Sequence, residues 1–310
     1  MEIIDSLFDA KLNIDTAITV GKFDGLHVGH HLLTSLIKEQ GPELKTCVVT
    51  FGNSPRISLN DIENEVLITN EEREVLLNDL GIDYLVCAPF DEKMMTTSPE
   101  DFIKTLCNNL NMKYIACGDD FRFGYKGKGD VLLLESLSKV FNYKTTVVEK
   151  IKEDKRDISS TYIREELKQG NIDHVNKLLG YNFFVFGRIV HGAHLGTQIG
   201  IPTINIVPPD NKMLPGFGVY VSNVEIGNKL YHGVTNVGVK PTVTDNNKVV
   251  VETHILDFDK DVYGEKAKVT FCKFLRSEIK FNNVDELKNQ MNHMILVNRM
   301  EDGSSCAEVI

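Results

Sequence analysis

Two histidines stand three residues apart in segment 21–30, which reads GKFDGLHVGH and follows the apolar run 17–20. A loop that leaves a parallel strand and opens a helix points backbone N–H groups outward, and the helix dipole adds about half a positive charge. Glycine lets a ligand approach the backbone closely. His27 and His30 can face the same anion across one helical turn. The segment therefore predicts a phosphate site where two imidazole donors stabilise charge that develops in an in-line displacement.

Two other segments in the first half carry groups that could bind a nucleotide. In SSTYIR, three hydroxyl residues stand where a helix would begin: Ser159, Ser160 and Thr161. Arg164 follows one turn later, so hydroxyls and free N–H groups could bind a phosphate oxygen while arginine neutralises it. In GDDFRFG, Asp120 and Arg122 follow an expected strand at 114–118. An ordinary capped helix and a charged turn at a strand end are the alternative interpretations.

The second half places oxygen ligands and a carboxylate on short expected strands. Thr203 and Asn205 are two residues apart and therefore face the same side of a strand. Hydroxyl and amide oxygens are hard ligands that suit a Mg²⁺ ion bridging nucleotide phosphates. Glu252 lies in the strand-like run KVVVETHIL, where an isolated carboxylate is usually solvated. Three glycines spaced by four precede Thr203: Gly192, Gly196 and Gly200.

The elements that must position these residues change in kind near Gly180. Before it, β-rich runs alternate with helical patterns, and two helix starts are readable: Thr69 with Glu72 forms a capping box, and Ser98 precedes a proline. This alternation predicts a parallel sheet wrapped by helices, with ligands beyond the carboxyl ends of the strands. The expected strands are 16–20, 45–51, 84–89, 114–118 and 144–149.

After Gly180, strand-like runs follow one another with little helix, which predicts an antiparallel barrel or sandwich. A helical pattern then begins near Asn283 and could lie against the barrel. We therefore expect an α/β protein with two domains, 1–180 and 181–310. The expected strands of the second domain are 183–190, 203–207, 219–226, 231–237, 249–256 and 267–274.

Composition excludes several classes of function. A formal net charge of −10 argues against broad attraction to nucleic acid or to an anionic membrane, so we expect neither as a partner. The six cysteines form no C-x-x-C pair, which favours a reducing cytoplasm. The N-terminal segment lacks signal-peptide features, and no apolar run approaches the roughly 20 residues of a membrane span. The segment DFDKDVYG begins like a calcium loop but has its glycine two positions too late, so we expect no calcium there.

The motifs in their order resemble one family. GKFDGLHVGH is similar to the G-x-F-D-G-x-H-x-G-H signature of bifunctional bacterial riboflavin kinase/FMN adenylyltransferases, or FAD synthetases, and GDDFRFG, SSTYIR, PTIN and ETHILDF follow in family order. The resemblance implies a Rossmann-like HxGH nucleotidylyltransferase domain, then an antiparallel β-barrel riboflavin kinase domain with a C-terminal helix. It implies that the second domain phosphorylates riboflavin to FMN with ATP and Mg²⁺. The first would move AMP from ATP to FMN, giving FAD and pyrophosphate.

The same resemblance assigns roles to residues. His27, His30 and Arg164 would act on the ATP phosphates in the first domain, and Glu252 would take the proton from the ribityl 5′-hydroxyl in the second. Thr203 and Asn205 would bind magnesium, and Arg276 would lie near the flavin. The nucleotide-binding residues would be Gly21, Phe23, Asp24, Gly25, Asp120, Arg122, Ser159, Ser160 and Thr161, with Gly192, Gly196 and Gly200 in a flap over ATP.

Three positions depart from the family pattern. Ser54 stands where a histidine is expected after the second strand, the flap lacks its usual R-G-R, and Ile204 replaces alanine in P-T-A-N. These departures leave open a paralogue with one impaired activity, which would act as a single-activity enzyme or a flavin-binding regulator. A nucleotidylyltransferase for another phosphorylated acceptor is a further alternative.

Overall fold

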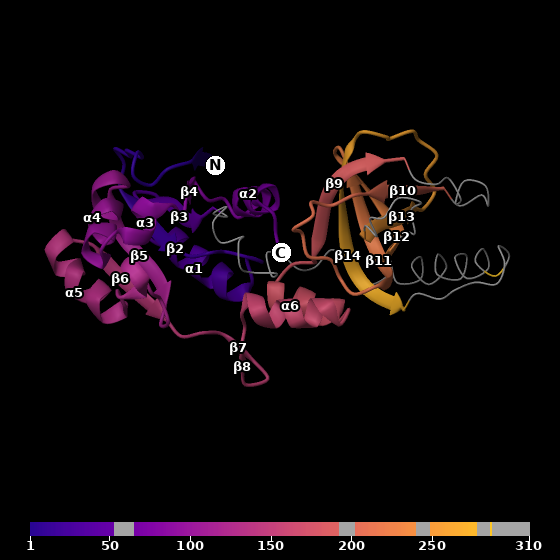
Figure 1. The fold of residues 1–310 in the computed structure, drawn as a ribbon. Coiled ribbons are helices and arrows are strands. Elements are labelled where there is room, and N and C mark those ends of the chain that lie inside the picture. The colour runs from indigo at the N-terminus through magenta and orange to yellow at the C-terminus, as the bar shows by residue number, and fades with distance from the viewer. Residues whose placement is uncertain (53–64, 192–201, 240–248, 278–285, 287–310) are drawn as a thin grey trace. The chain divides into compact units, whose positions relative to one another are not determined.

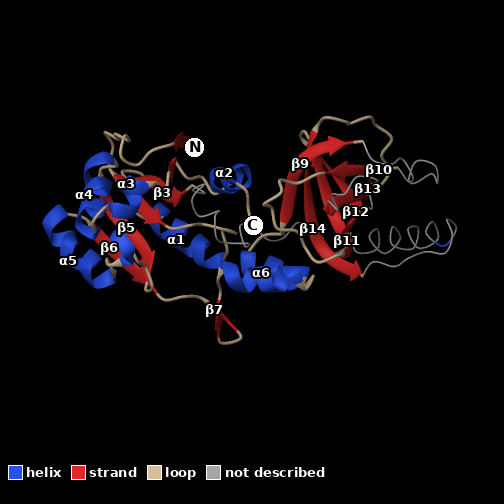
Figure 2. Ribbon diagram, in the orientation of Figure 1, coloured by secondary structure: helices blue, strands red, loops and turns tan. Residues whose placement is uncertain are grey.

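The computed structural model describes residues 1–52, 65–191, 202–239, 249–277 and 286. The chain divides into two compact units, Met1–Ser159 and Ser160–Ile310 (Figure 1). Each unit has its own kind of architecture: strands and helices alternate in the first, and strands dominate the second (Figure 2).

The N-terminal unit contains a six-stranded sheet in which every pairing is parallel. Its strand order is β1-β4-β3-β2-β5-β6. Helix α1 packs on the central strands, and α4 and α5 pack on β5 and β6. The elements are β1 (Glu2–Ile4), β2 (Thr16–Val20), α1 (Val28–Lys38), β3 (Lys45–Phe51), α2 (Asn70–Asp79), β4 (Tyr84–Ala88), α3 (Glu92–Thr96), α4 (Pro99–Asn109), β5 (Met112–Gly118), the 3₁₀ turn η2 (Tyr125–Gly127), α5 (Val131–Phe141), β6 (Lys144–Val148), β7 (Lys152–Glu153) and β8 (Arg156–Asp157).

The strand order reverses direction at β2. From β2 the chain builds outward through β3 and β4, and it then crosses back to add β5 on the other side of β2. In open α/β sheets, ligands bind in the crevice beyond the carboxyl ends of the strands at such a reversal. Segment 21–30 leaves β2 at this point and segment 118–124 leaves β5, so the sheet brings the two motifs to the same edge.

The five strands that the sequence predicts for this unit are all present, and their bounds lie at or close to the predicted ones. β2 and β3 have the predicted bounds, and all five residues of β2 are buried, as a central parallel strand requires. The capping box of Thr69 and Glu72 is formed, and Ser98 caps α4 ahead of Pro99. Strand β1 was not predicted, because three residues are too few to show a period.

The C-terminal unit begins with two helices and continues into a closed antiparallel barrel of order β10-β13-β12-β11-β14-β9. Helix α7 packs on β14, so the helices α6 and α7 group with the barrel, although the domain boundary expected from the sequence follows α7. The elements are α6 (Ser160–Lys168), α7 (Ile172–Leu179), β9 (Phe184–Val190), β10 (Thr203–Ile206), β11 (Gly218–Ile226), β12 (Lys229–Val239), β13 (Val249–Ile255) and β14 (Lys266–Arg276).

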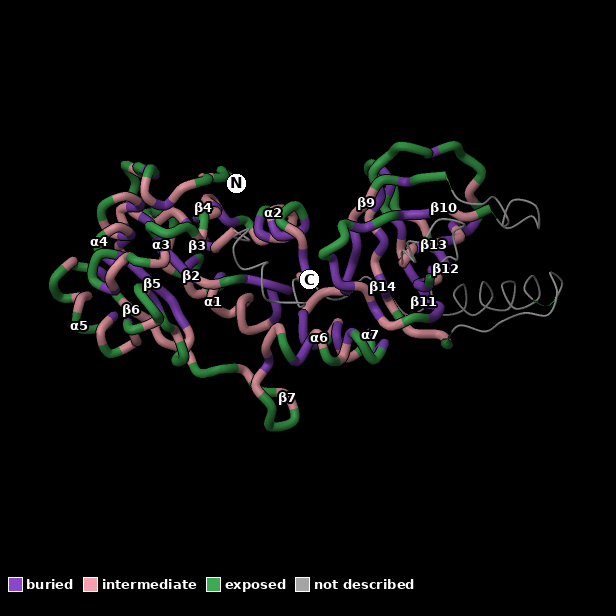
Figure 3. The backbone as a smooth tube through the Cα atoms, viewed as in Figure 1, coloured by how far each residue is buried: buried purple, intermediate pink, exposed green. Residues whose placement is uncertain are grey.

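Buried strand residues line the interior of each unit (Figure 3). In the barrel, three buried hydroxyls satisfy one another: Thr235 Oγ1 donates to Ser222 Oγ at 2.6 Å and lies 2.8 Å from Thr253 Oγ1. The helix expected from Asn283 onward lies outside the described residues. Among the helices described, none has the length and apolar character needed to cross a membrane.

Candidate active sites

The loop after β2 turns sharply through left-handed backbone. Gly21 N donates to Val49 O on the neighbouring strand at 3.1 Å, which fixes the exit of the loop from the sheet. Phe23, Gly25 and Leu26 then have φ of 47°, 88° and 40°. Glycine adopts such angles freely, whereas phenylalanine and leucine do so at a cost that is usually found at functional sites. The sequence signal of glycines after a strand therefore corresponds to a strained loop at the carboxyl end of β2, and phosphate binding there stays a prediction.

The loop ends by stacking the two predicted histidines. His27 is the N-cap residue of α1, and its imidazole stacks on that of His30 with ring centroids 3.8 Å apart and planes 24° apart. A Cβ atom at position 29 would lie 3.2 Å from the His27 ring. Glycine at position 29 therefore leaves the space in which the His27 ring sits, and the structure brings both catalytic candidates together as predicted.

Helix α1 has an N-terminus without a side-chain cap. In the other helices of the described N-terminal unit, the capping side chains are Thr69 on α2, Asp91 on α3, Ser98 on α4 and Asp130 on α5. The side chain of the N-cap His27 takes none of the first N–H groups of α1, although the N–H of His30 donates to His27 O at 2.7 Å. The helix dipole favours an anion at this end of α1.

Burial keeps both histidines uncharged. Desolvation, with a contribution from the charge of His31, lowers the pKa of His27 from 6.5 to about 4. Desolvation also lowers the pKa of His30 well below its usual range, and the charges of neighbouring groups, including Arg73, lower it further. The Nδ1 atoms of His27 and His30 are buried and have no hydrogen-bond partner within the described residues. A phosphate beside these rings would provide hydrogen-bond acceptors and would favour their protonated forms.

The side chains of Phe23 and Asp24 hold the loop in place through buried contacts. Phe23 is fully buried, and its ring centroid lies 4.9 Å from that of His30. Asp24 Oδ1 accepts hydrogen bonds from the N–H groups of Leu67 at 2.9 Å and Ile68 at 3.3 Å. Both residues were predicted to bind the nucleotide. The contacts give their side chains a role in positioning the histidines and the start of α2, and direct contact with a nucleotide stays a prediction.

Asp120 and Arg122 lie after β5, on the same sheet edge as the histidines. Asp120 pairs with Lys150 at 2.7 Å, and Arg122 pairs at 3.3 Å with Asp130, the cap residue of α5. Arg122 also lines a cavity of about 480 Å³ in the N-terminal unit. Arg122 thus lies at the wall of a cavity, and the nucleotide binding expected of Asp120 and Arg122 stays a prediction.

The cavity beside Arg122 is built from aromatic residues that follow successive strands. Phe51 ends β3, Phe90 follows β4, and Phe121 and Phe123 follow β5. The rings of Phe121 and Phe123 are stacked at 5.3 Å, and those of Phe51 and Phe90 meet edge to face at 5.7 Å. An apolar, aromatic cavity of this size suits a planar ring system. The sequence offered a signal that was missed, namely an aromatic residue at the end of three consecutive strands.

The hydroxyl segment SSTYIR forms a helix start as predicted. Helix α6 begins at Ser160, with Ser159 directly before it, and Thr161 is exposed in its first turn. Arg164 lies one turn along, partly buried. The local structure thus agrees with the sequence, while phosphate binding by Ser159, Ser160, Thr161 and Arg164 stays a prediction.

In the barrel, the predicted metal ligands and the predicted base lie on neighbouring strands. Asn205 on β10 is paired in register with Glu252 on β13. Thr203 Oγ1 donates to Glu252 Oε1 at 2.8 Å. A hydroxyl that donates its hydrogen keeps its oxygen lone pairs, so Thr203 can bind a cation while it holds Glu252. These oxygen donors fit a magnesium ion that also binds nucleotide phosphates.

Asn205 and Glu252 begin a row of directly paired residues that the strand register extends around the barrel. Glu252 pairs with Asn236 on β12, Asn236 pairs with Val219 on β11, and Val219 pairs with Arg276 on β14. Directly paired residues face the same side of a sheet, so Arg276, whose pairing with Val219 adjoins a register shift, lies in the same row as Glu252. Burial lowers the pKa of the Arg276 guanidinium from its usual value. Asn236 was not predicted, since an asparagine in a strand carries no spacing signal of its own.

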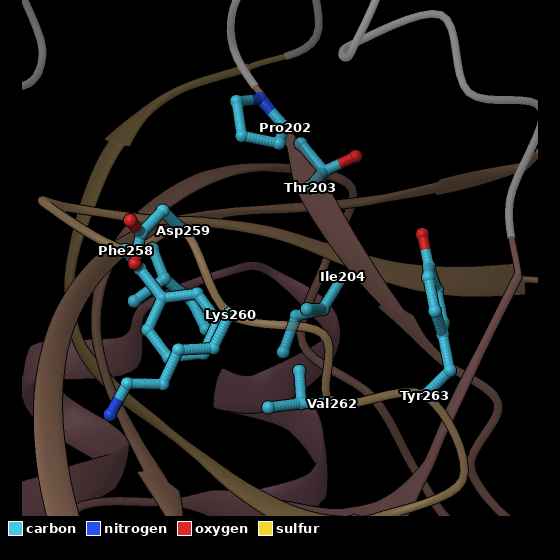
Figure 4. Close-up of a pocket in the computed structure, with 9 residues that line it drawn as sticks. Pro202, Thr203, Ile204, Phe258, Asp259, Lys260, Val262 and Tyr263 are labelled. Carbon is cyan, nitrogen blue, oxygen red and sulfur yellow. The ribbon is translucent and has the colours of Figure 1, made fainter.

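A second cavity, of about 340 Å³, lies next to Thr203. Phe258 and Tyr263 stand on opposite sides of it, with Ile204 and Val262 between them (Figure 4). Ile204, which departs from the family pattern, is thus a wall of this cavity. Segment 257–264, considered only as a calcium loop in the sequence, supplies the aromatic wall. The flap glycines Gly192, Gly196 and Gly200 and the departure at Ser54 lie outside the described residues.

Fold and site together define a class of protein: a doubly wound α/β unit with a histidine phosphate loop, followed by a barrel with a carboxylate beside hard oxygen ligands. Comparison with family models agrees with both halves. The FAD synthetase model matches residues 9–162, and the riboflavin kinase model matches residues 179–299. The chain belongs to the family of bifunctional riboflavin kinase/FMN adenylyltransferases.

Relatives of that description cover most of the chain. The protein of this name from Escherichia coli K12 is 36% identical over 279 residues, 88% of each chain. The one from Buchnera aphidicola of Schizaphis graminum is 34% identical and covers 91% of this chain and 92% of its own. A solved structure from Streptococcus pneumoniae, described as a macrolide-efflux protein, is 31% identical with a TM-score of 0.86, covering 96% of this chain and 98% of its own.

Proposed function

We propose that this protein phosphorylates riboflavin to FMN in its C-terminal unit and adenylylates FMN to FAD in its N-terminal unit, with ATP as the co-substrate of both reactions. One observation carries the proposal: the paired histidines and the Thr203–Glu252 pair occur in one chain, each on the fold of its family domain. Relatives named as bifunctional favour this reading over a paralogue with one impaired activity. The N-terminal domain would comprise residues 1–180 and the kinase domain residues 181–310.

In the adenylylation, a phosphate oxygen of FMN forms a bond to the α-phosphorus of ATP. The bond from that phosphorus to the bridging oxygen breaks, and pyrophosphate leaves with the electron pair. His27 and His30 donate hydrogen bonds to the phosphate oxygens on which charge develops, and the first N–H groups of α1 add to this. No nucleophilic side chain is needed, because the histidines act by positioning and by charge stabilisation.

The flavin ring of FMN has a suitable pocket in the same unit. The aromatic cavity lies beyond the carboxyl ends of β2 to β5, at the same sheet edge as the histidine loop. Phe121 and Phe123 present stacked rings there, and Arg122 lies at its wall. We assign the isoalloxazine ring to this cavity. Arg122 would then favour the phosphate-bearing flavin through its charge.

In the kinase unit, Glu252 takes the proton from the ribityl 5′-hydroxyl as that oxygen attacks the γ-phosphorus of ATP, and ADP leaves. Thr203 and Asn205 would hold Mg²⁺, which when bound neutralises charge on the ATP phosphates. The hydrogen bond from Thr203 keeps the Glu252 carboxylate beside the strand that carries both ligands. Arg276, in the same row as Glu252, would lie near the flavin.

The three proposed substrates, riboflavin, FMN and ATP, are small molecules, and we propose that the protein works in the cytoplasm. The five cysteines that the structure describes are free, which is consistent with a reducing compartment. No contact with nucleic acid is needed for either reaction.

The test is product analysis. Purified protein is incubated with Mg²⁺, ATP and either riboflavin or FMN, and the flavins are separated by chromatography. We expect FMN and FAD from riboflavin, and FAD from FMN. A protein that forms neither product from either flavin would overturn the proposal, and one that binds flavin tightly without turnover would establish the regulator instead.

A further inference from the structure

Arg73 is a buried cation with an incomplete set of partners. It lies in α2 and is only 5% exposed. Its Nη1 donates to Asn70 Oδ1 at 3.2 Å, whereas its Nε has no hydrogen-bond partner among the described residues. Among the described residues it forms no salt bridge, although the charges of Asp24 and Glu74 act on it from farther away and partly offset the lowering of its pKa by burial. Burial of a guanidinium without a directly paired anion is unfavourable, and the partnerless Nε leaves a donor to which an anionic ligand could bind.

The position of Arg73 in its helix adds to the cost. Thr69 is the N-cap of α2, so Arg73 is the fourth helical residue, close to the positive end of the helix dipole, where cations are disfavoured. The nearby carboxylate of Glu72 is used in the capping box, where Oε2 accepts from Thr69 N at 2.8 Å. Arginine at this position therefore lacks both a direct salt bridge and a favourable helix dipole, and its favourable electrostatic interactions with carboxylates are with Asp24 and Glu74 at longer range.

The start of α2 is tied to the histidine loop. Asp24 of that loop accepts hydrogen bonds from Leu67 and Ile68, the two residues that precede the N-cap. The tie places Arg73 within electrostatic reach of the stacked imidazoles: its charge contributes to the lowered pKa of His30. The cation and the two imidazoles are therefore buried groups around one loop, and all three favour an anion, while the carboxylate of Asp24 in that loop is engaged by the backbone of residues 67 and 68.

We propose that Arg73 is a further phosphate-binding residue of the adenylylation site, where its guanidinium binds a phosphate of the substrate that His27 and His30 face. The inference rests on the proposed adenylylation. Nε–H and one Nη–H of a guanidinium form a planar fork that matches two oxygens of a phosphate, so the unpartnered Nε is the donor that such a contact requires. The phosphate belongs to the triphosphate of ATP or to FMN.

The experiment compares Arg73→Met and Arg73→Lys with the wild-type protein in FAD synthesis. Exposed Lys104 on α4, changed to methionine, is the matched control for loss of a cation. The riboflavin kinase rate reports whether the C-terminal unit of each variant is intact, and the unfolding midpoint reports whether the N-terminal unit that carries residue 73 is folded. We expect Arg73→Met to lose about 10- to 100-fold in kcat/KM for FAD formation at an unchanged kinase rate. Arg73→Lys should recover part of this loss, since it keeps the charge without the fork.

The kinetic constants distinguish the two sources of phosphate. Raised values of KM for ATP and of the inhibition constant of pyrophosphate identify the triphosphate, whereas a raised KM for FMN alone identifies the flavin phosphate. Wild-type kinetic constants in both variants would overturn the inference, as would parallel loss of both activities with a lowered unfolding midpoint in both.

Failure of the proposed function gives a different result. If the wild-type protein forms no FAD, that function fails, and calorimetric binding of inorganic pyrophosphate to the wild type and to Arg73→Met then tests the site alone. Weaker binding by the variant would support the phosphate site, and equal binding would overturn it.

Discussion

The hydroxyl of Thr203 donates to the carboxylate of Glu252 across strands β10 and β13, with Oγ1 2.8 Å from Oε1. Thr203 is a predicted magnesium ligand and Glu252 is the predicted base, so the contact would link metal binding to proton removal in the proposed kinase site. It orients the carboxylate and keeps the lone pairs of the hydroxyl oxygen available to a cation. The two residues stand 49 positions apart, and only the register of the barrel brings them together.

Replacing Thr203 by valine tests this coupling, because valine has nearly the same shape but no hydroxyl. We expect the Mg²⁺ concentration for half-maximal FMN formation to rise about tenfold or more, together with a lower kcat. Thr203→Ser keeps the hydroxyl and is the matched control, which should stay near wild type. Equal behaviour of the two variants would mean that the hydroxyl has no part in the reaction.

Replacing Gly29 by alanine should impair only adenylylation. The added methyl group would lie 3.2 Å from the His27 ring, closer than ordinary contact allows, so the imidazole must shift by a few tenths of an ångström. Small displacements of a catalytic group are costly, and we expect a loss of roughly threefold to tenfold in FAD formation. The kinase rate of the same variant should be unchanged. A wild-type rate of FAD formation would show that the position of the His27 ring is not critical.

The buried histidine loop should make the protein sensitive to acid. The pKa of His27 is about 4 in the folded protein and 6.5 when exposed, so unfolding takes up a proton between these values. Its contribution to stability is fully present above pH 6.5 and is lost as the pH falls towards 4, by on the order of 3 kcal/mol.

The acid effect is measured by following the unfolding midpoint from pH 7 to pH 4.5. His27→Asn should lose less stability over this range than the wild type, whereas replacement of exposed His232 by asparagine should leave the slope unchanged. Identical slopes for the wild type and His27→Asn would show that His27 is not held neutral by burial.

Replacing Phe121 by alanine tests the flavin cavity. Loss of a ring from the stacked pair should weaken FMN binding, and we expect KM for FMN to rise about tenfold while KM for ATP in adenylylation changes little. Leu132→Ala, on the exposed surface of α5, is the control. An unchanged KM for FMN would place the flavin elsewhere.

Much of the fold followed from the sequence because its local signals were strong. The buried run of β2, the capping box at Thr69 and the cap at Ser98 specify their elements without distant partners. The paired histidines were also predictable, since their chemistry lies in one segment and requires only that a strand lead into a helix. For the same reason Thr203 and Asn205 could be placed on one strand.

What could not be predicted depends on contacts between distant segments. Arg73 looks like any charged residue of an amphipathic helix until its burial is known. Asp24 was expected at the nucleotide, yet its carboxylate binds the backbone of residues 67 and 68, more than forty positions away. The row that joins Glu252 to Arg276 needs the register of four strands, which no spacing within one strand reveals.

The central claim is that one chain carries two independent sites, and the products of two single variants test it most directly. With riboflavin, ATP and Mg²⁺, His30→Ala should accumulate FMN and form at least a hundredfold less FAD, because a donor to the developing charge is lost. Glu252→Gln should form FAD from added FMN but almost nothing from riboflavin. Equal loss of both activities in either variant would contradict the account.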